Sequence, residues 1–69
     1  MKYRNKTIGQ KIKIFSQQRK ITQTELGKCV DLDRDAISRM ERNKQLVKAD
    51  VLFGIAGTLG INIYDFGKL

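Results

Sequence analysis

Two helix-start signals that stand close together restrict the fold of this chain more than any other feature of its sequence. The first is the segment Thr22-Gln23-Thr24-Glu25, in which the Thr hydroxyl and the Glu carboxylate can each satisfy an amide that the first turn of a helix leaves unpaired. The second is Asp31-Leu32-Asp33, where a turn-prone acid precedes an acid suited to cap a helix that starts at Arg34. The spacing predicts two short helices joined by a turn of about three residues.

Apolar residues recur at helical spacing in the rest of the chain as well. Ile8, Ile12 and Phe15 lie at i, i+4 and i+7, which predicts a first helix that is capped by Thr7 and buries one stripe. Similar stripes predict helices over residues 34–42 and 48–59, and a last short helix, capped by Asn62, after the helix-ending Gly60. The sequence therefore predicts an all-α fold made of short helices.

The supply of chemically active residues excludes most enzyme classes. The chain has 69 residues, no His and a single cysteine, Cys29, so it cannot form an ordinary zinc site, a Cys–His pair or a Ser–His–Asp triad. We expect no enzymatic activity, no metal and no cofactor. One thiol also excludes an internal disulfide, and no apolar run approaches the roughly 20 residues of a membrane span, so we expect a cytoplasmic protein without a membrane partner.

The charge is distributed unevenly along the chain. The formal net charge is +7, and all of it lies in residues 1–20, which hold seven Lys and Arg and no acid. Such a segment favours an anionic partner, although a solvated basic arm that only keeps the protein soluble would carry the same charge. Residues 1–6 are expected to form a flexible arm, which either contacts phosphates or a minor groove through Lys2, Arg4 and Lys6 or is simply a disordered tail.

The expected third helix presents a polar face on the side opposite its buried stripe. An Arg on this face, such as Arg34 or Arg39, can donate two hydrogen bonds to one guanine, and Asp35 can accept one from cytosine. Two short helices joined by a tight turn, with such a face on the second, are the geometry that inserts a helix into the DNA major groove. An ordinary solvated helix with Asp35 and Arg39 paired at i, i+4 would present the same residues.

Four segments resemble the phage repressor and Cro-type helix-turn-helix family. They are Ile8-Gly9-Gln10-Lys11-Ile12, Thr22-Gln23-Thr24-Glu25-Leu26, Ala36-Ile37-Ser38-Arg39-Met40-Glu41 and Ile55-Ala56-Gly57-Thr58-Leu59-Gly60-Ile61. The most specific part is a Thr-Gln-x-x-Leu motif that is followed, at the family's spacing, by Ile-Ser-Arg-x-Glu. The resemblance implies a compact five-helix bundle of the lambda-repressor type, with one domain over residues 7–69 and a helix-turn-helix core over residues 23–42.

The resemblance also implies a function and a set of functional residues. Members of the family regulate transcription, and this chain is expected to be a repressor that binds a palindromic operator in double-stranded DNA as a homodimer, with no effector evident. The expected base-reading residues are Arg34, Asp35, Ser38 and Arg39. The expected phosphate contacts are Gln23, Arg42, Asn43 and Lys44. The expected dimer interface consists of Ile61, Ile63, Tyr64, Phe66 and Leu69, although Tyr64 and Phe66 could instead close the core. The alternative is a protein-interaction module, such as an antitoxin or anti-repressor, with the same fold.

Several positions depart from the family pattern. Ser16 stands where members commonly carry a basic residue that pairs with the Glu ending the third helix, so Glu41 needs another partner, expected to be Arg19 or Lys44. Asp31 and Asn43 replace glycines, and both residue types tolerate positive φ.

Three further residues carry expectations of their own. Gly27 should let another helix approach closely. Ile14, off the buried stripe, is expected to be a lone surface hydrophobe, and Cys29 an unreactive surface thiol.

Overall fold

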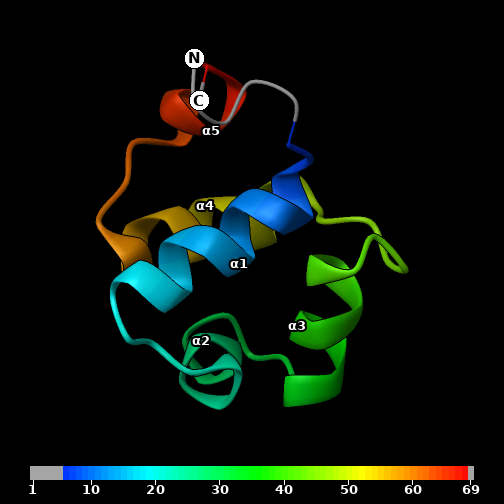
Figure 1. Cartoon of the computed structure of the whole chain (residues 1–69). Helices are drawn as coiled ribbons and strands as arrows, with labels where there is room; N and C mark the ends of the chain where they lie inside the picture. The colour runs from blue at the N-terminus through cyan, green and yellow to red at the C-terminus, as the bar shows by residue number, and fades with distance from the viewer. Residues whose placement is uncertain (1–5, 69) are drawn as a thin grey trace.

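The computed structural model describes residues 6–68, and all its regular elements are helices (Figure 1). Four helices of seven to eleven residues make up the bundle: α1 (Ile8–Gln18), α2 (Gln23–Cys29), α3 (Arg34–Glu41) and α4 (Ala49–Leu59). A helix of six residues, α5 (Ile63–Lys68), follows. The all-α class is confirmed: four helices make up the bundle, and the fifth, α5, is a short helix that adds the buried Phe66 to the core. The expected arm lies outside the described residues except for Lys6, and Leu69 also lies outside them.

Three helices begin at the caps that the sequence predicts. The side chains of Thr7, Thr22 and Asp33 each accept a hydrogen bond from the backbone amide three residues later, at 3.1, 3.1 and 2.8 Å. The backbone amides of Thr7 and Thr22 in turn donate to the side-chain oxygens of Gln10 and Glu25, which completes two capping boxes. Because a good N-cap contributes about 1 kcal/mol, these contacts fix where each helix starts.

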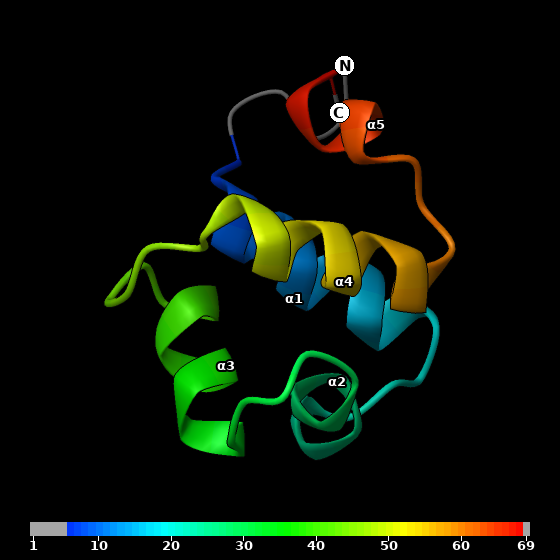
Figure 2. The ribbon, with the colours of Figure 1, turned by 180° about the vertical axis from the view of Figure 1, so that it is seen from behind.

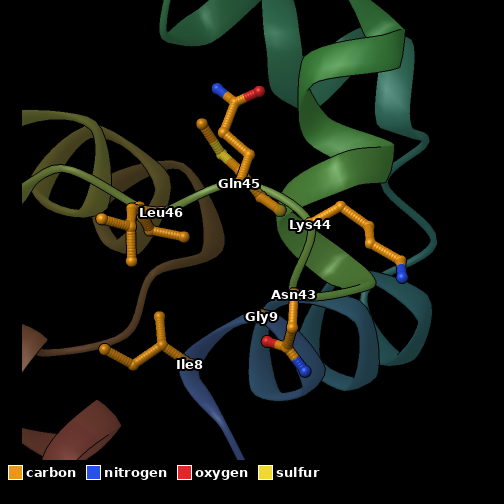
Figure 3. A pocket seen from close by; sticks show the side chains of 8 residues that line it. Ile8, Gly9, Asn43, Lys44, Gln45 and Leu46 are labelled. Carbon is orange, nitrogen blue, oxygen red and sulfur yellow. The ribbon is translucent and has the colours of Figure 1, made fainter.

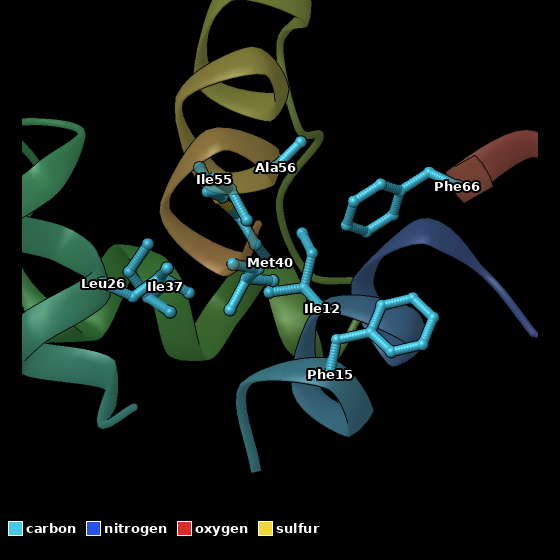
Figure 4. Close-up of a cluster of buried hydrophobic side chains, with 9 residues drawn as sticks. Ile12, Phe15, Leu26, Ile37, Met40, Ile55, Ala56 and Phe66 are labelled. Carbon is cyan, nitrogen blue, oxygen red and sulfur yellow. The ribbon is translucent and has the colours of Figure 1, made fainter. Parts of the chain in front are cut away.

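The helices enclose a single core of apolar side chains (Figure 4). Its most buried members are Ile12, Leu26, Ile37, Ile55 and Phe66. Complete burial of a side chain of this size stabilises the fold by roughly 1.5–3 kcal/mol. α2 lies on one side of α1 and α4, and α5 lies on the opposite side, as both ribbon views show (Figures 1 and 2). α2 and the turn that follows it are therefore remote from α5.

Phe66 corrects one expectation about the dimer interface. Its ring is only 1% exposed and meets the ring of Phe15 edge-on, with centroids 5.5 Å apart and an interplanar angle of 84°. The buried Lys11 also donates a hydrogen bond from Nζ to the Phe66 carbonyl oxygen, which ties α5 to α1. Phe66 thus belongs to the core, since α5 inserts it against α1, and its side chain is not on a surface that a second copy could contact.

Two glycines mark the places where backbone segments approach most closely. A Cβ on Gly27 would lie 2.4 Å from the carbonyl oxygen of Leu32, so its close neighbour is the turn that follows α2 and not, as expected, another helix. A Cβ on Gly9 would lie 2.0 Å from the carbonyl oxygen of Met40, so α1 crosses the end of α3 at this residue. Absence of a side chain at these two positions lets α2, its turn and α1 hold α3 in place.

The residues with a left-handed backbone conformation are only in part those that the sequence predicts. Asp31 and Asn43 have φ of 59° and 61°, as their substitution for glycine predicts, and Gly60 ends α4 with φ of 70°. Lys20 also has a positive φ, 57°, which the sequence did not indicate. Ile14 was expected on the surface alone but is partly buried against the core, so that prediction is wrong.

Candidate nucleic-acid interface

α2 and α3 are joined by a turn that the backbone itself stabilises. The amides of Val30 and Leu32 both donate to the carbonyl of Gly27, at 3.1 and 2.8 Å. Asp33 then caps α3, and Ala36, Ile37 and Met40 are buried on its inner face. The turn and the core together fix which face of α3 is presented to solvent.

The outer face of α3 carries the residues expected to read bases. Arg34, Asp35 and Arg39 are exposed, and Ser38 is half-buried. Arg42, at the end of the helix, donates from Nε to the Ser38 carbonyl at 3.3 Å, so its guanidinium lies along α3. Four of these five side chains are therefore accessible to a partner that approaches α3 from outside.

A chain of hydrogen bonds connects the two helices through Gln23. Arg34 donates from Nε to Gln23 Oε1 at 3.3 Å, and Gln23 donates from Nε2 to Glu41 Oε1 at 2.9 Å. The carboxylate of Glu41 is buried, with 6% of the residue exposed. The expected partners of Glu41 were Arg19 and Lys44, and this prediction is corrected: Gln23 is its partner.

Arg19, one of the expected partners of Glu41, is held by Phe15 instead. Its guanidinium lies over the ring of Phe15, 5.7 Å from the centroid, and donates to the Phe15 carbonyl. Gln23, by contrast, lies in the first turn of α2 beside the last turn of α3, and its amide supplies the donor that the carboxylate requires.

A second hydrogen bond holds the other arginine of this face. Arg39 donates from Nε to Gln45 Oε1 at 2.9 Å. Gln45 lies in the loop between α3 and α4, a segment without helical periodicity, so its contact with Arg39 could not be expected from sequence. Each expected base-reading arginine is thus oriented by a glutamine from a different segment.

The loop that follows α3 carries the other expected phosphate contacts. Asn43 and Lys44 are exposed, and Asn43 Oδ1 accepts a hydrogen bond of 2.9 Å from the hydroxyl of Thr7. The loop and the start of α1 border a hollow of about 330 Å³, from which the Lys44 side chain extends away (Figure 3). Leu46, on the loop, is 90% exposed. Thr7 anchors the loop, so Lys44 is presented from a defined backbone.

The acid at the start of α2 is held in its charged form. The carboxylate of Glu25 accepts from the amide and the hydroxyl of Thr22, and Lys28 lies nearby, which together lower the pKa of Glu25 below its ordinary value. Within residues 6–68, no three His, Cys, Asp or Glu side chains gather as a metal site would require.

A family model for the helix-turn-helix matches residues 12–66, which is most of the chain. The chain belongs to the helix-turn-helix family.

Its similarity to a curated relative points to the repressors of that family. The chain is 35% identical over 57 residues to an immunity repressor protein of Bacillus phage phi105. The match covers 83% of this chain and 40% of the phage protein, so the chain spans less than half the length of that relative.

Solved structures share the helix-turn-helix fold. The P22 c2 repressor, solved in complex with a synthetic operator, superposes with a TM-score of 0.81 and 26% identity over 90% of this chain and 94% of that one. PlcR of Bacillus thuringiensis, solved with the peptide PapR7 and DNA, superposes with a TM-score of 0.79 and 32% identity. The match covers 87% of this chain and 21% of PlcR. ClgR of Corynebacterium glutamicum, at 22% identity and a TM-score of 0.82, shares the fold. The chain therefore has the fold of the helix-turn-helix family, and the proteins it is similar to are repressors and other regulators.

The surface expected to form the dimer is only partly exposed in this helix-turn-helix protein. Tyr64 is 75% exposed, whereas Ile61 and Ile63 are half-buried against the core. Cys29 is free and exposed at the end of α2, as expected. No helix among residues 6–68 has the length and apolar character needed to span a bilayer.

Proposed function

We propose that this chain is a sequence-specific repressor that binds a palindromic operator in double-stranded DNA as a homodimer, with α3 of each copy in a major groove. The observation that carries the proposal is the division of α3 into two faces: Ile37 and Met40 are buried, while Arg34, Asp35 and Arg39 are exposed. A rigid helix that presents arginines outward is suited to base recognition. The similarity to the P22 c2 repressor, itself solved in complex with a synthetic operator, supports DNA binding by this fold.

The side chains on the outer face of α3 have complementary roles in this proposal. Arg34 and Arg39 each read a guanine through two donors, and Asp35 accepts from a cytosine amino group. Ser38 contacts a base edge between them. Each good bidentate contact contributes about 1–3 kcal/mol of discrimination between bases.

Phosphate contacts frame this face and fix the register of α3 on the duplex. Arg42 and Lys44 contribute positive charge at the end of α3, and Asn43 retains an amide group that can donate. Gln23 has one amide hydrogen engaged by Glu41, which leaves the second available for a phosphate. The basic arm of residues 1–6, ahead of a domain over residues 7–69 with its core at 23–42, adds further phosphate contacts.

Two copies must be held with their third helices one helical turn of DNA, roughly 34 Å, apart. We propose that Ile61, Ile63 and Tyr64, with Leu69 beyond the described residues, form the surface between the copies. The exposed ring of Tyr64 supports this assignment, and Phe66 contributes from within the core by holding α5 in place.

Selection of bound sequences from random DNA duplexes tests the whole proposal. The purified chain is expected to enrich a motif with two-fold symmetry, and sedimentation on that motif is expected to give two chains per duplex. A folded protein that enriches no motif at low salt would contradict sequence-specific binding, and a non-symmetric motif with one chain per duplex would contradict the homodimer.

A further inference from the structure

We infer that the buried carboxylate of Glu41 is a positioning group for Arg34, acting through Gln23, so that base preference at one operator position depends on a residue that does not reach DNA. The inference deepens the proposed function and rests on it. The juxtaposition that carries it is the hydrogen-bonded series from Glu41 Oε1 to Gln23 Nε2 at 2.9 Å, and from Gln23 Oε1 to Arg34 Nε at 3.3 Å.

The chemistry of the three groups fixes the direction of this series. An ionised carboxylate only accepts hydrogen bonds and a guanidinium only donates them, whereas an amide group does one at each end. The Glu41 carboxylate therefore holds the Nε2 end of Gln23 toward itself. The Oε1 end must then face outward, which is the one orientation of the amide that Arg34 can use.

Because Glu41 is buried, it determines the orientation of Gln23, and Gln23 in turn restricts the exposed Arg34. Glu41 is 6% exposed, Gln23 is half-buried and Arg34 is exposed. A buried carboxylate left without a donor is costly, so the Gln23 amide is held in place. The long side chain of Arg34 has many rotamers in solvent, and an acceptor fixed at its Nε restricts them before DNA arrives.

The orientation matters because Arg34 must present a planar fork to a base. Engagement of Nε by Gln23 fixes the plane of the guanidinium and leaves the two terminal nitrogens to extend outward. If the Gln23 amide turned over, it would present its donor end to the Arg34 donors. The arginine would then swing away, and its contribution to base discrimination would fall.

Arg39 and Gln45 provide an internal control for this inference. Arg39 is held by a loop residue, through a 2.9 Å hydrogen bond that does not involve Glu41. A change at Glu41 or Gln23 should therefore alter the preference at the position read by Arg34 and leave the position read by Arg39 unchanged.

The experiment compares the motifs selected from random duplexes by the full chain and four variants. Arg34→Ala first identifies the operator position that Arg34 reads. Glu41→Gln removes the charge that orients the amide, and Gln23→Lys keeps a donor for Glu41 but repels Arg34. Gln45→Met is the matched control, and thermal melting shows that each variant is folded.

Glu41→Gln and Gln23→Lys are each expected to reduce preference at the Arg34 position by about 3- to 10-fold, a part of the roughly 5- to 150-fold that a bidentate contact supplies. Gln45→Met should reduce preference only at the Arg39 position. Folded variants that weaken all sequences equally, with the motif unchanged, would overturn the inference and leave Glu41 a structural residue. Because Gln23→Lys keeps the donor to Glu41, it tests the inference even if Glu41→Gln does not fold. The absence of any motif with the parent chain would instead overturn the proposed function.

Discussion

α1 and α3 both carry positive charge, but they hold it in different ways. α1 and the residues on either side of it have only bases, and one of these, Lys11, is buried and bonded to the Phe66 carbonyl. α3 carries Arg34 and Arg39 beside Asp35 and Glu41, and a glutamine holds each arginine. Positive charge in a segment without acids attracts any polyanion, whereas arginines held in a segment of balanced charge can distinguish one base from another. The comparison separates the strength of binding from its specificity.

The largest effect should come from removing the buried side chain that packs α3 against the core. Ile37 is completely buried, so Ile37→Ala is expected to cost about 2–5 kcal/mol of unfolding free energy, a large part of the stability of so small a domain. Chemical denaturation measures the loss. The exposed Lys13→Ala variant of α1 is the control and should unfold close to the parent chain; equal losses would mean that the two helices do not differ as described.

Arg39→Ala should separate specificity from charge. Loss of a base contact is expected to weaken operator binding by about 1–3 kcal/mol and to relax preference at one position. Competition binding on single-base operator variants measures both effects. Lys44→Ala removes the same charge and should weaken all sequences alike, with a salt slope lower by about 1. An unchanged motif for Arg39→Ala would remove this residue from the base-reading set.

Deletion of residues 1–6 tests whether the bases ahead of α1 contribute to the strength of binding and not to its specificity. The deletion removes three bases, Lys2, Arg4 and Lys6, and should reduce the slope of log affinity against log salt by up to about 3. Operator preference should stay the same, because the residues of α3 are untouched. Binding titrations over a series of salt concentrations, on operator and on random duplex, measure the two quantities; a loss of preference would show that the arm itself reads sequence.

The smallest effect concerns the start of α2. The lowered pKa of Glu25 means that its ionised form stabilises the fold above the pKa it has in the unfolded chain, and that this contribution is lost as the pH falls through the folded value. Glu25→Gln should therefore lower the melting temperature slightly at neutral pH, and the difference should disappear as the pH falls through the lowered pKa of Glu25 in the folded chain. Thermal melts from neutral to acid pH follow it. A difference that grows in acid would contradict the capping role of the carboxylate.

Local signals predicted the helices well because caps and apolar stripes act within a few residues. Thr7, Thr22 and Asp33 cap where their sequence context indicates, and the outer face of α3 carries Arg34, Asp35 and Arg39 as expected. These features need no knowledge of what lies across the molecule.

Partners that come from distant segments could not be predicted in this way. The bond of Glu41 to Gln23 and that of Arg39 to Gln45 depend on how α2, α3 and the following loop are placed in space. The burial of Phe66 depends likewise on where α5 turns back toward α1. The sequence pattern shows that Phe66 is apolar but does not distinguish a core residue from one at a dimer interface.

The crossing of α1 over the end of α3 at Gly9 has a consequence for genetics. Any side chain at this position would clash with the Met40 carbonyl oxygen. Relief of that clash moves α1 and α3 apart and loosens the packing of α3 against the core. Gly9→Ala changes none of the residues proposed to contact DNA, yet by loosening α3 it should make folding, and with it the proposed repression, heat-sensitive. Position 9 is therefore where a screen for temperature-conditional alleles of this regulator should find its mutants.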